Sequence, residues 1–179
     1  ANVARIRGMD RDYGDVYLDL RGERAIDLNA ELDLNSLRLT LHGMTGSNAT
    51  LSGYMETEQT APINLTGTLT WNSYMATLTN PENDVAALQG SGGPAFGGLQ
   101  YVDANDVLLR NLVTAEEVSL DIESVGQGFT IRQAYNTSVK ADFVELAADN
   151  IVLGANGRSS VKAGYVLGLT FGDTMILNG

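Results

Sequence analysis

The stretch AIDLNAELDLNSLRLTLHG, residues 25–43, places an aliphatic side chain at nearly every second position. The aliphatic residues from Ile26 to Leu34 share one parity, and those from Leu37 to Leu41 take the other. A period of two is typical of a β-strand with one buried face. Because a one-residue slip turns every side chain to the opposite face, the parity change predicts a turn or bulge between two strands, 25–34 and 37–42.

The same alternation continues along the chain in Thr-rich segments that Gly, Asn or Pro residues bound. Further strands are predicted at 15–20, 49–56, 63–71, 73–79, 99–102, 106–113, 118–125, 128–135, 138–146, 150–155 and 160–171. A short helix is the alternative at 138–146, because ADFVELAAD also contains helix-forming residues. One short helix is predicted near 81–89, because Asn80 suits a cap, Pro81 a first helical position and Gly90 a helix end. The sequence therefore predicts an all-β, antiparallel β-sandwich-like fold with one short helix, and a β-solenoid-like fold is the alternative.

A length of 179 residues suits a single all-β domain, 1–179. The segment GSGGPAFGG, residues 90–98, has the composition of a loop or linker. The other organisation is therefore two β subdomains, 1–89 and 99–179, joined by residues 90–98.

The composition excludes several classes of partner. With 22 acidic and 11 basic residues the formal net charge is -11, which repels phosphate backbones, so we expect no nucleic-acid partner. No apolar run approaches the roughly 20 residues of a membrane-spanning helix, so we expect no membrane insertion. The absence of cysteine excludes disulfides and thiolate metal sites. A polar content rich in Thr, Asn, Ser and Gly favours an extracellular or cell-surface location, with a virion as the alternative.

The oxygen-bearing row from Asp27 to Asn35 alternates along a predicted strand, which spreads its side chains about 7 Å apart instead of gathering them. Calcium needs six to eight converging oxygens, so this row is better interpreted as a solvated face. Two loops gather oxygens more closely, although Asp and Asn also favour plain turns. The candidate calcium ligands in these loops are Asp10, Asp12, Asp15, Asp103, Asn105 and Asp106. No other cofactor is expected.

No motif in the chain indicates a particular reaction. His42 is the only histidine, and no nucleophile elbow accompanies it. Paired carboxylates such as Asp121 and Glu123 would need to face each other across a cleft for glycosidase chemistry. We expect a protein that is not an enzyme, and a carbohydrate-binding or glycan-processing domain is kept as an alternative.

The C-terminal stretch GYVLGLTFGDTMILNG, residues 164–179, combines an apolar strand with interrupting glycines. Such a strand is either an ordinary central strand or one shared with a neighbouring subunit. The candidate interface residues are Tyr165, Leu167, Leu169, Phe171 and Ile176.

From about residue 97 to 179 the sequence resembles the pilus-system surface proteins of Gram-negative bacteria, in the succession GLQYVDAND, VSLDIES, DNIVLGANGRSSV and GYVLGLTFGDTMILNG. The resemblance implies a secreted, β-rich protein with a structural or adhesive role and without catalytic residues.

The prediction for function is a non-catalytic structural subunit of an extracellular bacterial filament, pilus or surface matrix. It would assemble with itself or with other structural subunits through β-strand addition and apolar burial. A phage virion structural protein, either a capsid-decoration or a tail component, is the alternative.

Overall fold

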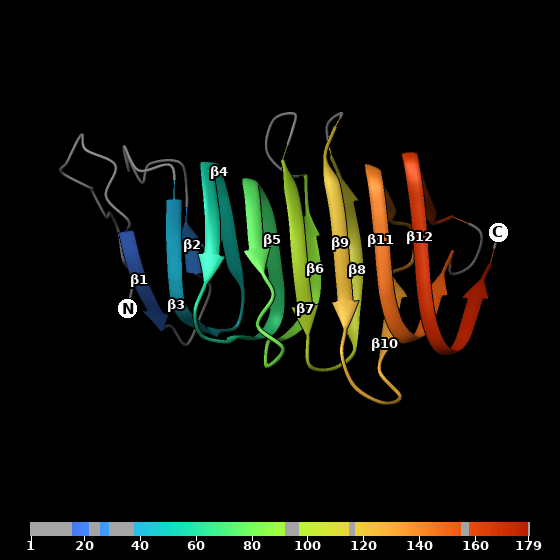
Figure 1. The fold of residues 1–179 in the computed structure, drawn as a ribbon, viewed down its shortest axis with the longest axis horizontal. Coiled ribbons are helices and arrows are strands. Elements are labelled where there is room, and N and C mark those ends of the chain that lie inside the picture. Colours follow the sequence, from blue (N-terminus) through green and yellow to red (C-terminus); the bar gives the residue numbers. More distant parts are fainter. Residues whose placement is uncertain are drawn as a thin grey trace.

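The computed structural model describes residues 16–21, 26–28, 38–91, 97–114, 117–154 and 158–178. Within these ranges the strands lie across the long axis of the molecule, stacked from β1 at one end to β12 at the other (Figure 1). The strands are β1 (Val16–Arg21), β2 (Ile26–Leu28), β3 (Arg38–Gly46), β4 (Ala49–Gln59), β5 (Ile63–Leu78), β6 (Asp84–Gly90), β7 (Gly98–Asp103), β8 (Val107–Val113), β9 (Ser119–Ser124), β10 (Thr130–Gln133), β11 (Ser138–Leu153) and β12 (Ser160–Leu177).

The strands form one 12-stranded sheet that winds into a β-solenoid of about five turns. Every strand pairing in the described residues is parallel. We call a set of residues that lie opposite one another in successive strands a column. The chain returns to the same column after steps of 19, 23, 21, 24 and 23 residues, through Thr57, Ala76, Leu99, Leu120, Val144 and Leu167. Each coil therefore adds one layer along the axis, as in other solenoids.

The predicted antiparallel β-sandwich is wrong, and the β-solenoid that was the alternative is the observed architecture. Several strands lie close to their predicted positions, for example Val107–Val113 for the predicted 106–113. However, β5 joins the predicted strands 63–71 and 73–79, and β11 joins 138–146 and 150–155. The predicted turn or bulge after residue 34 lies outside the described residues. Alternation of apolar and polar residues shows that one face of each strand is buried, but it does not show which strand lies beside it. The alternation therefore could not predict whether neighbouring strands run parallel or antiparallel.

The predicted helix at 81–89 is also wrong, because residues 84–90 form β6. Asn80 Oδ1 accepts a hydrogen bond from the Glu82 amide at 2.9 Å, so the residue that resembled a helix cap forms a turn instead. Gly90 ends the strand with a φ of 148°, and a Cβ there would collide with the Trp71 carbonyl. The glycine is needed for close approach between coils.

The two sides of the 90–98 segment belong to the same sheet. β5 pairs with β6 before the segment and with β7 after it, and Gly98 lies in register between Met75 and Ser119. The ladder of strands is thus continuous from one side of the segment to the other.

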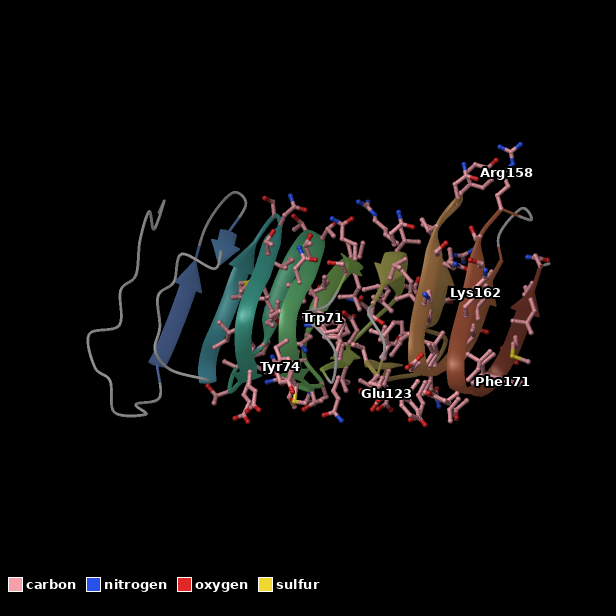
Figure 2. The ribbon with its side chains drawn as sticks, turned by 90° about the horizontal axis from the view of Figure 1, so that it is seen from above. Trp71, Tyr74, Glu123, Arg158, Lys162 and Phe171 are labelled. Atoms are coloured by element: carbon pink, nitrogen blue, oxygen red, sulfur yellow. The ribbon has the colours of Figure 1, made fainter. Side chains whose placement is uncertain are left out.

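The interior of the solenoid is a column of buried apolar side chains contributed by successive coils. Leu69, Leu88 and Leu109 stack in register and are at most 1% exposed. Figure 2 shows Trp71 inside the solenoid, and it is 1% exposed. Full burial of each such side chain contributes about 1.5–3 kcal/mol, so stacking of coils is the main source of stability.

Candidate functional site

The terminal coil of the solenoid, β12, pairs along almost its whole length with β11, from Ser160 opposite Ser138 to Leu177 opposite Leu153. No strand among the described residues lies on its other side. Figure 1 shows β12 at one end of the stack, opposite β1. We call this unpaired side of β12 the terminal edge. It carries backbone groups that are ready to pair with another strand.

Seven of the ten large apolar side chains that are exposed among the described residues belong to β12. This terminal apolar surface consists of Tyr165, Val166, Leu167, Phe171, Met175, Ile176 and Leu177. Single exposed apolar residues are normal on a soluble protein, whereas a contiguous group marks an interaction site. The terminal edge is therefore the candidate site.

Several members of the terminal apolar surface continue the columns of the core. Leu167 is 49% exposed although its neighbour Val144 is 0% exposed, and Leu177 is 59% exposed although Leu153 is 4% exposed. These side chains are covered on one side by β11 and open on the other. The end of the core is thus in contact with solvent at β12.

The predicted interface residues all lie in β12 but differ in their surroundings. Leu169 is partly buried against the core, whereas Leu167, Phe171 and Ile176 are 49%, 44% and 43% exposed. Tyr165 is 73% exposed, and its ring centroid lies 5.6 Å from that of Phe143 in β11. Sequence reasoning missed Val166, Met175 and Leu177. Val166 follows an irregularity in the pairing of β11 with β12 and departs from the alternation of Tyr165 and Leu167.

The glycines of β12 leave room for acidic side chains of β11. A Cβ at Gly164 would collide with the Asp142 carboxylate, and one at Gly172 with the Asp149 carboxylate. A Cβ at Gly168 would lie 3.3 Å from the Cγ of Glu145. Three carboxylates of β11 therefore lie over the glycines of the terminal strand.

The predicted calcium ligands fall into two groups. Asp10, Asp12 and Asp15 lie outside the described residues. In the second group, Asp103 Oδ2 accepts a hydrogen bond from the Val85 amide at 3.0 Å, and Asp103 Oδ1 accepts one from the Asn105 amide at 3.0 Å. The exposed Asp106 instead accepts one from the Thr130 amide at 2.7 Å. These oxygens are directed at backbone amides of different coils, and no group of three or more His, Cys, Asp or Glu residues in the described part could hold a metal ion.

Asp103 has a third partner in the nearby Tyr101 hydroxyl, which donates to its carboxylate. Burial raises the pKa of Asp103 to about 6, although its hydrogen bonds from Tyr101, Val85 and Asn105 act in the opposite direction. Burial and the nearby Asp103 also raise the pKa of Tyr101. The pair holds a corner between two coils, and no open site adjoins it: both residues are at most 1% exposed.

A buried amide cluster occupies the equivalent corner one coil earlier, and sequence reasoning missed it. Asn83 is 0% exposed; its Oδ1 accepts from the Ile63 amide at 2.8 Å, and its Nδ2 donates to the Leu78 and Val102 carbonyls at 3.0 and 2.9 Å. Gln59 bonds both ends of the Asn83 amide. The residues just before Asn83 resemble a helix start, so nothing local in the sequence revealed this role.

Charges of like sign are stacked on the outside of the solenoid. Lys140 lies in register with Lys162, and Asp121 with Glu145. Figure 2 shows Arg158 and Glu123 on opposite sides of the molecule. Asp121 and Glu123 alternate along one strand, which sets them about 7 Å apart on one side and does not place them across a cleft from each other.

No family model, curated protein or solved structure matches this chain. The described residues contain no helix with the length and apolar content needed to cross a membrane.

Proposed function

We propose that this protein is a non-catalytic structural subunit of an extracellular filament or surface matrix, which assembles by strand addition at the terminal edge. The observation that carries the proposal is the open end of the core at β12, where Leu167 and Leu177 are 49% and 59% exposed beside buried neighbours. A strand added there would pair with backbone groups and bury apolar side chains in the same step.

The architecture supports this role. In a solenoid each coil contacts only its neighbours, so a new coil from another subunit meets the same geometry as an internal coil. β11 shows how a coil packs between two others: Val144 and Leu146 are at most 1% exposed between the coils on either side. A coil added on β12 would bury the side chains of β12 in the same way. A cysteine-free chain rich in Thr, Asn and Gly suits an extracellular setting.

The test is assembly of purified protein, followed by sedimentation velocity and electron microscopy. The double variant Leu167→Asp/Leu177→Asp places two charges where a new coil would be buried, so we expect it to stay monomeric while the wild type forms polymers. The matched control is Tyr135→Asp, which changes a 52% exposed aromatic residue outside β12 and should assemble normally.

Circular dichroism of both variants establishes that they retain the β fold. A wild-type protein that remains monomeric at high concentration, or a double variant that polymerises as the wild type does, contradicts the proposal.

A further inference from the structure

We infer that the occupant of the terminal edge is the coil of β1 and β2 from a second copy of this chain, so that subunits stack head to tail in one polarity. This inference rests on the proposed function and adds the identity of the partner surface. β1 and β12 lie at opposite ends of the solenoid (Figure 1), so one copy presents both surfaces without closing on itself.

The columns of the solenoid show which residues would meet. One column runs without interruption from Val16 through Leu39, Thr57, Ala76, Leu99, Leu120 and Val144 to Leu167. A coil added on β12 in the same register would therefore place Val16 of the second copy opposite Leu167. An apolar residue at the start of the column meets an exposed apolar residue at its end.

A second column lies on a different side of the solenoid and gives the same result. It runs from Leu28 through Leu51, Trp71, Gly90, Leu112 and Val139 to Val161. Val161 is partly buried against the end of the core, and Leu28 of the added coil would fall opposite it. Two columns with apolar residues at both ends allow the core to continue from one subunit into the next.

A third column joins Tyr17 to Gly168, through Thr40, Glu58, Thr77, Gln100, Asp121 and Glu145. A coil added on β12 in the same register would therefore place Tyr17 of the second copy opposite Gly168.

Electrostatics disfavours the opposite arrangement, in which two terminal edges meet head to head. Asp142, Glu145 and Asp149 lie over the glycines of β12, so a head-to-head contact would bring together the carboxylates of both copies.

The absence of native cysteine allows the contact to be trapped directly. Adjacent strands lie about 4.8 Å apart, within the Cα separation of about 4.4–6.8 Å that a disulfide accepts. The variants are Tyr17→Cys and Gly168→Cys, each alone, mixed in equal amounts, and combined in one chain. A Cβ at Gly168 meets only the flexible side chain of Glu145 at 3.3 Å or beyond, so this substitution is tolerated.

Under mild oxidation we expect a mixed disulfide dimer from the mixture and a series of covalent multimers from the double variant. The matched control pairs Tyr17→Cys with Thr170→Cys, two residues out of register. The in-register pair should react at least about tenfold faster, since only its thiols lie within disulfide range.

Dimers from Gly168→Cys alone that form as fast as the mixed dimer would overturn the head-to-tail arrangement in favour of a head-to-head one. Absence of the mixed disulfide overturns it too. Sedimentation of the wild type distinguishes failure of the head-to-tail inference from failure of the proposed function. Wild-type polymers without the mixed disulfide in the variants leave the proposed function standing, whereas a monomeric wild type contradicts both.

Discussion

Val144 in β11 and Leu167 in β12 are neighbours in one column, yet Val144 is 0% exposed and Leu167 is 49% exposed. Both belong to strands with the same alternation of apolar and polar residues. The difference is that β11 has a strand on both sides, whereas the described residues place a strand on only one side of β12. In a solenoid the burial of a side chain is therefore set by the neighbouring coils and not by its own strand.

The largest expected effect comes from removing apolar volume from an inner coil. Leu146→Ala should destabilise the fold by about 4 kcal/mol, because Leu146 is 1% exposed between Ile122 and Leu169 and its loss leaves a cavity. Leu167→Ala at the terminal edge should cost only about 1 kcal/mol, because its side chain is already half in water. Urea denaturation of dilute protein measures both, and equal losses would contradict the comparison.

A smaller loss is expected from the buried amide cluster. Asn83→Ala should cost about 3 kcal/mol, because the Ile63 amide and the Leu78 and Val102 carbonyls lose their partner inside the fold. Asn80→Ala is the matched control in the adjacent turn, where the Glu82 amide can bond to water instead. Asn80→Ala should shift the urea midpoint much less. A similar shift in both variants would show that the buried hydrogen bonds of Asn83 do not contribute more than those of an exposed turn.

The stability of the fold should also depend on Asp103. Its pKa is raised from 3.8 to about 6 on folding, so the folded state binds the proton more tightly and stability falls as pH rises through this window. The loss between pH 4 and pH 6 is about 2 kcal/mol, and little further change follows above this range. Urea midpoints of the wild type and Asp103→Asn at several pH values test this. The midpoint of the wild type should fall relative to that of Asp103→Asn as the pH rises. A constant difference would show that the carboxylate does not titrate in this window.

The smallest effect concerns the stacked charges outside the core. Glu145→Gln should stabilise the fold by about 0.3 kcal/mol, because Glu145 lies directly beside Asp121 in the neighbouring strand. Glu123→Gln is the matched control, since its neighbours Val102 and Ala147 are uncharged. The gain at Glu145 should disappear at high salt. A gain that persists there would point to a cause other than charge repulsion.

The sequence allowed the strands to be predicted because alternation is a local signal. Val107–Val113 and Ser119–Ser124 lie close to the predicted 106–113 and 118–125. The solenoid was not distinguished from a sandwich, because the coils return after 19 to 24 residues and no fixed repeat is visible. The segment near Asn83 was misread as a helix, because a turn and a helix start use the same side-chain-to-backbone hydrogen bonds.

The candidate site was predicted in part. The apolar residues of 164–179 were recognised as an interface candidate from their composition, and the five that were named all lie in β12. Their role at an interface stays a prediction. Their exposure could not be predicted, because Leu167 and Val144 lie in strands with the same alternation. They differ only in whether a described strand pairs on both sides of their own strand.

The sequence by itself determined that this protein is built from β-strands, with one apolar face on each strand and polar residues at the turns, since each of these properties depends on residues that are adjacent along the chain. The tertiary structure alone decided that the strands run parallel, that Asn83 and Asp103 are buried at corners, and that the core is open at β12. These properties depend on contacts between residues about 20 positions apart, and the energy of such contacts comes from stacking one coil on the next.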